Sequence, residues 1–165
     1  MPSWKEASAK GFEFEKFILE DINNKVLPLA YKNMKKEDYS FYDIFLFDGN
    51  FSEPIKTLEC KYDEMSYSTG NICIEVGCNG RWSGLLITKA DYWLIADGET
   101  AYIIEKQRIH DCIIEHPEIR YETFKVQQEG NDTKNMNIYL IKKSIFEPYC
   151  CEISNINEIK YNCFK

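Results

Sequence analysis

Apolar residues recur at helical spacing near the start of the chain and predict an amphipathic helix over residues 3–27. Ser3 can cap this helix, with Glu6 three residues later as its capping-box partner. Pro28 ends the helical pattern, because proline cannot continue it. The residues that we expect to face the core are Ala7, Gly11, Phe14, Ile18 and Ile22.

After a polar stretch at 31–40, which is typical of a loop, the hydrophobic period changes. Residues 41–47 (FYDIFLF) and 55–62 (IKTLECKY) are short aromatic and β-branched runs, and each predicts a strand. The turn-forming cluster at 48–54 joins them, so we expect a hairpin. Residues 63–71 are polar, and their composition favours a flexible segment.

The middle of the chain contains a second candidate hairpin. Residues 72–76 (ICIEV) fit either a helix or a strand, and the glycine-rich 77–84 predicts a loop. Residues 91–97 and 101–105 predict two strands that pair across a DGET turn. A helix is expected at 106–116, stopped by the proline that follows.

The last third of the chain has a weaker pattern. Residues 129–135 form a turn-rich break, and 136–146 predict a late strand with a short helical start, whereas 147–165 fit no element. The order of elements indicates an α/β fold with a central mixed sheet of four to five strands flanked by helices. With no repeat or linker in view, we expect one domain over 1–165, in which 120–165 is a C-terminal extension whose packing the sequence does not determine.

Composition fits a folded chain: 165 residues, 44% of them hydrophobic, exclude a disordered or fibrous protein. There are 27 acidic against 20 basic residues, a net charge of −7. Binding to nucleic acid would therefore need a local patch and a cation. No apolar run approaches the roughly 18–20 residues of a membrane span, and the charged N-terminus does not resemble a secretory signal. We expect a cytoplasmic protein.

Cysteine spacing gives no metal or disulfide motif. None of the seven cysteines forms a CxxC pair, and the two histidines do not complete a zinc site. We expect reduced, mostly buried thiols.

A small set of charged residues interrupts the apolar strands. Asp43 is the lone charge in its strand, and Thr57, Glu59 and Lys61 share one face of the next. Burying ionised groups is costly unless they are paired or bound to a cation. A hairpin would bring Asp43 near Glu59, and two carboxylates beside an ammonium group fit a divalent-metal site. The alternative is a Glu59–Lys61 pair exposed on an edge strand.

Two further acids are candidates for the same site. Glu15 falls close to the apolar stripe of the first helix, whereas Glu13 falls on its more polar side. The alternative for Glu15 is a salt bridge at the edge of the stripe. Asn71 and Glu75 share a face in either a helix or a strand, so Glu75 is a candidate catalytic residue. Its alternative is a surface acid.

These residues carry a resemblance to a known family. Asp43, followed after fifteen residues by Glu-Cys-Lys at 59–61 and preceded by G-x-x-x-E at 11–15, resembles the PD-(D/E)XK nuclease superfamily. Within it, the chain is most similar to small phage or bacterial endonucleases and Holliday-junction-resolvase-like proteins. The resemblance covers about residues 8–105. The motifs are short, and Tyr42 stands where many members have proline.

The resemblance implies a restriction-endonuclease-like core and Mg²⁺- or Mn²⁺-dependent hydrolysis of DNA. Asp43 and Glu59 would hold the metal, joined by the backbone carbonyl of Cys60, and Glu15 would reach it directly or through water. Lys61 would orient or activate the attacking water. Near a metal, a partly desolvated lysine can position that water or lose its own proton more easily than a free lysine.

The implied partner is DNA, branched or structured substrates included, with no membrane, and a homodimer is expected only by analogy. Trp82 could stack on a splayed base, although a tryptophan is more often part of the core. The three clustered lysines could clamp a phosphate or could form a solvated loop. The candidate nucleic-acid-binding residues are Lys32, Lys35, Lys36, Asn71, Arg81, Trp82, Ser83 and Lys89.

Two other functions remain open at this point. One is a non-catalytic nucleic-acid-binding or interaction protein that retains the nuclease fold. The other is a nuclease subunit of a larger complex, or one that acts on RNA.

Overall fold

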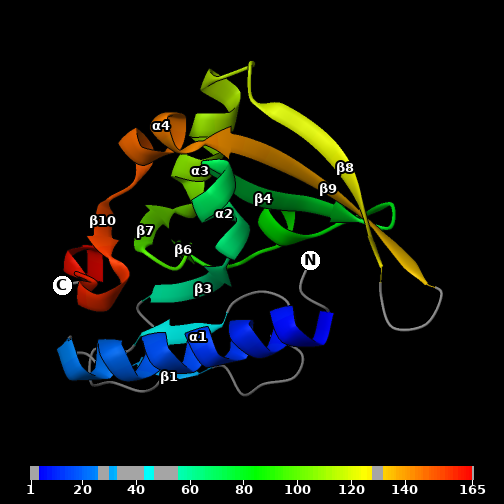
Figure 1. Cartoon of the computed structure of the whole chain (residues 1–165). Coiled ribbons are helices and arrows are strands. Elements are labelled where there is room, and N and C mark those ends of the chain that lie inside the picture. The colour runs from blue at the N-terminus through cyan, green and yellow to red at the C-terminus, as the bar shows by residue number, and fades with distance from the viewer. Residues whose placement is uncertain (1–3, 26–29, 33–42, 47–55, 128–131, 165) are drawn as a thin grey trace.

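The computed structural model describes residues 4–25, 30–32, 43–46, 56–127 and 132–164. Within these ranges the chain is an α/β protein, as the sequence predicts, with a central mixed sheet. Figure 1 shows the long first helix along one side of this sheet and a second, elongated sheet on the other.

The first helix, α1 (Trp4–Lys25), confirms the predicted helix. It packs against the central sheet through a buried apolar face. Gly11, expected to face the core, is only half-buried, and no described atom lies within 4 Å of the position that its Cβ would occupy. The side chain of Ala7 lies outside the described set. The buried residues of this face are Phe14, Ile18 and Ile22.

The central sheet has six described strands, rather than four to five, in the order β1-β2-β3-β6-β7-β10. The β3–β6 pair is parallel, and the other neighbours are antiparallel. Both predicted hairpin pairings, β2 with β3 and β6 with β7, are confirmed. The strands are β1 (Ala30–Lys32), β2 (Ile44–Leu46), β3 (Lys56–Tyr62), β6 (Tyr92–Ala96), β7 (Thr100–Glu105) and β10 (Glu152–Asn155).

The first strand corrects part of the loop expected at 31–40. Residues 31 and 32 belong to β1, which pairs antiparallel with β2. The rest of that predicted loop, 33–40, and the predicted turn at 48–54 lie outside the described residues.

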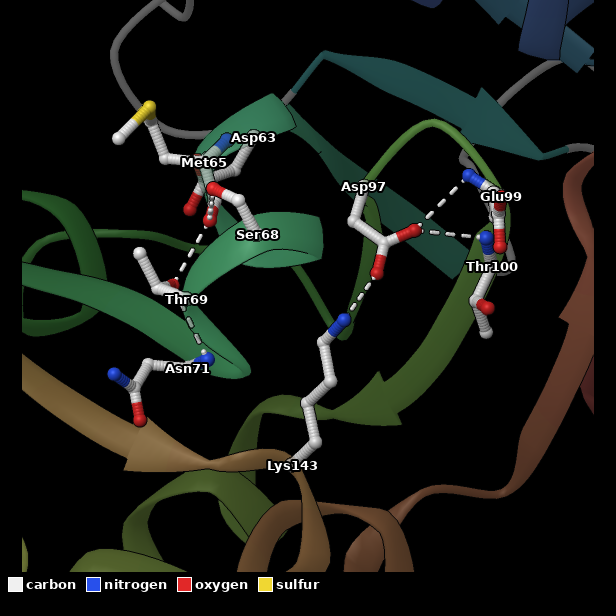
Figure 2. Close-up of polar contacts among 9 residues, drawn as sticks. All are labelled: Asp63, Met65, Ser68, Thr69, Asn71, Asp97, Glu99, Thr100 and Lys143. Atoms are coloured by element: carbon white, nitrogen blue, oxygen red, sulfur yellow. Dashed lines mark hydrogen bonds and ion pairs between the residues drawn. The ribbon is translucent and has the colours of Figure 1, made fainter.

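The segment between β3 and β6 differs most from the prediction. Residues 63–71, expected to be flexible, contain the helix α2 (Glu64–Thr69). Asp63 caps its start, because its carboxylate accepts a hydrogen bond from the backbone N of Met65 at 3.0 Å (Figure 2). Gly70 ends it in the left-handed conformation, with φ of 72°.

The strand alternative for 72–76 is confirmed by β4 (Asn71–Cys78). The loop expected at 77–84 is instead a tight hairpin, in which β5 (Arg81–Trp82) pairs with the end of β4, followed by a short 3-10 turn at Gly84–Leu86.

A second, antiparallel sheet has the order β5-β4-β9-β8. Its outer strands, β8 (Arg120–Gln127) and β9 (Thr133–Lys142), come from the extension whose packing the sequence left open. The short helix α4 (Lys143–Phe146) follows β9, so the helical turn expected at the start of this strand lies at its end.

The helix α3 (Lys106–Glu115) confirms the predicted second helix. Together with the second sheet it covers the face of the central sheet opposite α1, where a second apolar cluster includes Trp93, Ile74 and Ile141. The central sheet is therefore buried on both faces. None of the described helices is long and apolar enough to cross a membrane.

The tail contains three short 3-10 turns, Glu147–Tyr149, Ile156–Glu158 and Asn162–Phe164. It also corrects the expectation of reduced thiols, because Cys151 and Cys163 form a disulfide. The other five cysteines are free.

An ion pair between Lys143 and Asp97 joins α4, which follows β9 of the second sheet, to the end of β6 in the central sheet (Figure 2). The carboxylate of Asp97, at the end of β6, accepts hydrogen bonds from the backbone N of Thr100 at 2.8 Å and of Glu99 at 3.0 Å. Its other oxygen accepts one from Lys143 Nζ at 2.5 Å. Burial alone would raise the pKa of Asp97, but these hydrogen bonds hold it below its ordinary value.

We expect Asp97→Asn to lower the free energy of unfolding at pH 7 by about 3 kcal/mol, because Lys143 loses its counter-charge in a mostly buried position. A carboxyl with a lowered pKa stabilises the fold above its unfolded value of about 3.9, and this contribution disappears as the pH falls through the folded value. Urea unfolding at pH 7 and pH 3 measures both effects. The exposed Glu158 supplies the control, Glu158→Gln. A wild-type advantage that persists undiminished at pH 3 would contradict this assignment.

Candidate active site

Pairing of β2 with β3 places Asp43 beside the centre of β3. Its backbone N donates to the carbonyl oxygen of Leu58 at 2.9 Å, which extends the pairing that begins at Ile44 and Leu58. Its carboxylate Oδ2 accepts a hydrogen bond from the backbone N of Cys60 at 2.7 Å. One oxygen of Asp43 is thus fixed by the strand that carries the other candidate residues.

Glu59 and Lys61 lie on the same face of β3, as strand alternation predicts. Lys61 Nζ lies 2.8 Å from Glu59 Oε1 and 5.7 Å from the ring centre of Trp93. The Glu59 side chain is 12% exposed and that of Lys61 41%. Because β3 lies between β2 and β6, the alternative of a pair on an exposed edge strand is wrong.

The charges of two other carboxylates act on Asp43 at this point. The pKa of Asp43 is raised to about 7, first by burial and then by the negative charges of Glu59 and Glu15. The hydrogen bond from Cys60 N and the charge of Lys61 oppose this shift. The charge of Glu15, which comes from α1, is therefore felt at Asp43, whereas its predicted role at a metal stays a prediction.

Lys61 keeps its proton in this arrangement. Burial acts to lower its pKa, but the charge and hydrogen bond of Glu59, followed by the charges of Asp43 and Glu75, raise it above the ordinary lysine value. Lys61 is thus a cation and hydrogen-bond donor here. The option that it loses its proton readily is not favoured in the metal-free protein.

Glu75 reaches this cluster from β4. It is half-buried, and its Oε1 accepts a hydrogen bond from Ser83 Oγ at 2.6 Å, so it is not a freely solvated surface acid. Gly84, with φ of 51°, makes this contact possible: a Cβ there would lie 2.2 Å from the carbonyl oxygen of Glu75. Ser83, a candidate nucleic-acid contact from the sequence, holds the Glu75 carboxylate through this hydrogen bond.

The predicted nucleic-acid residues divide into two groups. Arg81 and Trp82 stand exposed on β5 next to Ser83, and Trp82 is 75% exposed, so its alternative as a core residue is wrong. Lys89 is exposed beyond the 3-10 turn that follows β5. Asn71 instead lines a separate cavity of about 610 Å³ with Arg120, at the opposite end of β4. The side chains of the lysines at 32, 35 and 36 lie outside the described set.

A metal site is not preformed in the described part of the chain. No group of three or more His, Cys, Asp or Glu side chains there is placed to hold a metal ion. The carboxylates of Asp43 and Glu59 already bond to Cys60 N and Lys61. The buried Cys60 thiol has a pKa raised well above its ordinary value, first by burial and then by Asp43, so it stays protonated and is no thiolate ligand.

Sequence reasoning missed one support of the strand that carries the site. Asp91 Oδ2 accepts hydrogen bonds from Thr57 N at 2.9 Å and from Thr57 Oγ1 at 3.2 Å, which fixes the start of the β3–β6 pair. Asp91 is the first residue of a predicted strand, a position at which an acid that accepts hydrogen bonds from the neighbouring strand could have been anticipated.

Comparisons of the chain with protein-family models, with curated proteins and with solved structures find no match.

Proposed function

We propose that the protein is a Mg²⁺-dependent endodeoxyribonuclease with a restriction-endonuclease-like core. The observation that carries the proposal is the gathering of Asp43, Glu59, Glu15 and Lys61 around one internal strand. Negative charges that raise the pKa of the mostly buried Asp43 are costly to the fold. A bound cation would offset this cost, and such perturbed pKa values are typical of functional sites.

The element order supports the same proposal. A first helix packs on a hairpin whose second strand carries Glu59 and Lys61, and that strand pairs in parallel with β6. The segment from α2 to β5 lies between β3 and β6 in the chain and carries Glu75. This order is compatible with the restriction-endonuclease-like arrangement.

The donor set fits a hard cation. The carboxylates of Asp43 and Glu59 and the carbonyl of Cys60 are oxygen donors, which Mg²⁺ prefers, and Mg²⁺ needs only one or two carboxylates. When bound, the ion would neutralise phosphate charge and make a bound water more acidic. Glu59 would have to exchange part of its contact with Lys61 for the metal.

The chain's own residues would then have separate tasks. Lys61, held protonated mainly by its contact with Glu59, would donate hydrogen bonds that position the attacking water or a phosphate oxygen. The backbone N of Cys60 holds Asp43, and Ser83 holds Glu75. Glu15 adds negative charge from α1 that favours a cation beside Asp43.

We expect Asp43→Asn to raise the stability of the metal-free protein near neutral pH by about 1–3 kcal/mol, because it removes a repelled, desolvated charge. Millimolar Mn²⁺ should raise the melting temperature of the wild type by mass action and leave that of Asp43→Asn nearly unchanged. Thermal melting with and without Mn²⁺ measures both. The control is Asp132→Asn, which removes an exposed acid. A Mn²⁺-induced rise in melting temperature that is absent from the wild type, or equal in the wild type and Asp43→Asn, would remove the metal site from this proposal.

One observation favours a second function. The ion pair between Glu59 and Lys61 leaves no preformed metal group among the described residues, which suits a nucleic-acid-binding protein that retains the fold without catalysis. Incubation of purified protein with duplex, branched and single-stranded DNA, and with RNA, in Mg²⁺ or Mn²⁺ separates the two. Metal-dependent cleavage supports the nuclease, and binding without cleavage supports the alternative.

A further inference from the structure

Strand register determines which side chains share the face of the second sheet that α3 packs against. Trp82 pairs with Gly77, and Gly77 pairs with Asn137 of β9. Tyr139, two residues further along β9, has its side chain on the same face, because side chains alternate along a strand. Glu75 pairs with the residue between these two and so points to the opposite face. Trp82 therefore lies on the face of the sheet opposite to Glu75.

An apolar hollow of about 400 Å³ lies on this face, between the sheet and α3. Its lining includes the buried Val76 and the half-buried Tyr139 from the sheet, and Ile113 from α3. The one polar side chain in the lining is His110, and no carboxylate, lysine or arginine takes part. Because 28% of the residues of this chain are charged, an uncharged lining of this extent distinguishes the hollow from the rest of the surface.

Large apolar side chains stand in solvent around the hollow. The exposed fractions are 75% for Trp82 of β5, 76% for Ile114 of α3, 54% for Tyr121 of β8 and 46% for Leu86 of the 3-10 turn. Side chains of this size at these fractions expose on the order of 100–200 Å² each, so the patch presents roughly 500 Å² to water. The largest apolar patch of a typical monomer measures about 300–600 Å² and is often functional. The patch therefore indicates a surface that another molecule covers.

The size and shape of the patch favour a second copy of this chain as that molecule. Each partner in a standard protein interface buries about 800 Å², and the patch supplies more than half of this area. A twofold-symmetric contact also requires one patch that is complementary to itself, with projecting groups and a hollow side by side. Here Trp82 and Ile114 project beside a hollow that has room for an indole ring.

Charge has a defined effect on such a contact. The uncharged lining offers no ion pair to a partner, so the contact would be held by burial of apolar surface. Each copy has a net charge of −7, and two copies therefore repel one another at long range. Salt screens this repulsion, so association between copies should become stronger as the salt concentration rises.

We propose that this face of the second sheet is the interface of a homodimer, in which Trp82 of each copy inserts into the hollow of the other. Glu75, on the opposite face of the sheet, lies outside the contact. The interface does not depend on the proposed nuclease function.

The test measures the mass of the assembly by light scattering and by sedimentation over a range of protein concentrations. The wild type should have twice the mass of one chain above about 10 μM. Trp82→Ala and Ile114→Glu, on different elements, should each raise the concentration at which the dimer dissociates by about tenfold or more. Both side chains are exposed in the monomer, so circular dichroism and melting should match the wild type. The matched control is Met65→Glu, which places the same charge at an exposed apolar position of α2.

The dependence on salt gives a second reading of the same contact. Raising NaCl from about 50 mM to about 500 mM should strengthen the dimer several-fold, because it screens the repulsion between the two acidic copies. A dimer that dissociates as salt rises would be held by ion pairs, which would contradict an apolar interface.

The other outcomes are equally decisive. A wild type that stays monomeric at about 100 μM would overturn the proposal in favour of a different protein as the occupant of this face. A dimer that Trp82→Ala and Ile114→Glu leave intact, or that Met65→Glu weakens equally, would also overturn it. A monomer that cleaves DNA would remove the interface and leave the nuclease proposal standing. A dimer that Trp82→Ala dissociates, but that cleaves no DNA with Mg²⁺ or Mn²⁺, would do the reverse.

Discussion

Lys61→Ala should lower the rate of DNA cleavage by a factor of about 10²–10⁴, the usual effect of losing one positioned catalytic group. Lys61 is the cation that contacts Glu59 at 2.8 Å, and the charges of Asp43 and Glu75 help to raise its pKa. Without it, nothing at this position donates a hydrogen bond to the attacking water or the phosphate. Initial rates on a labelled DNA substrate in saturating Mg²⁺ measure the effect.

The control for Lys61→Ala must separate catalysis from folding and from loss of charge. Lys160→Ala removes an exposed lysine in the C-terminal tail and should cleave at the wild-type rate. Because Lys61→Ala leaves the mostly buried Glu59 without its partner, we expect a loss of metal-free stability of about 1–3 kcal/mol, part of which Mn²⁺ restores. A folded Lys61→Ala protein that cleaves like Lys160→Ala would rule out the role assigned to this lysine.

The elements that could be predicted are those with a strong local period. The stripe containing Phe14, Ile18 and Ile22 defines α1, and the alternation along β3 places Glu59 and Lys61 on one face. The proximity of Asp43 follows from the hairpin, because a turn between two apolar runs brings them side by side. The positions of Asp43, Glu59 and Lys61 relative to one another therefore follow from patterns between residues that are close in the sequence.

The second sheet could not be predicted in this way. Strand β8 is mostly exposed, so its sequence RYETFKVQ lacks the apolar alternation that marks a half-buried strand. It exists because it pairs with β9, and such pairing between separate segments leaves little trace in either one. The helix α2 was missed because its six residues, in which Met65 and Tyr67 are exposed, form no apolar stripe, although its two caps, Asp63 and Gly70, were visible in the sequence.

The contacts that complete the candidate site depend on how segments that are separate in the sequence fold against one another. The bond between Ser83 and Glu75 requires the hairpin turn and the close approach of Gly84, neither of which a spacing pattern contains. The disulfide between Cys151 and Cys163 likewise depends on how the tail folds back beside β10. Sequence reasoning therefore proposed the charged residues of the candidate site without the contacts that hold them.

Glu15 and Glu13 provide a paired test of whether α1 contributes to catalysis. Both acids lie on the same helix two residues apart, but Glu15 is half-buried and acts on Asp43, whereas Glu13 is exposed beside a shallow pocket. We expect Glu15→Gln to lower cleavage by about 10²-fold and to weaken Mn²⁺ binding, as the loss of a residue that supports a metal site does. Glutamine is nearly isosteric and a good helix former, so the helix itself should be preserved.

Glu13→Gln removes the same charge from the same helix and should cleave within about twofold of the wild type. Loss of one negative charge slightly favours DNA binding in both variants, so a difference between them reports position rather than charge. Cleavage of a labelled duplex and of a branched junction, and Mn²⁺-dependent melting, provide the comparison. Equal activity of the two variants, or a greater loss in Glu13→Gln, would confine the catalytic residues to β2, β3 and β4 and leave α1 a packing role through Phe14, Ile18 and Ile22.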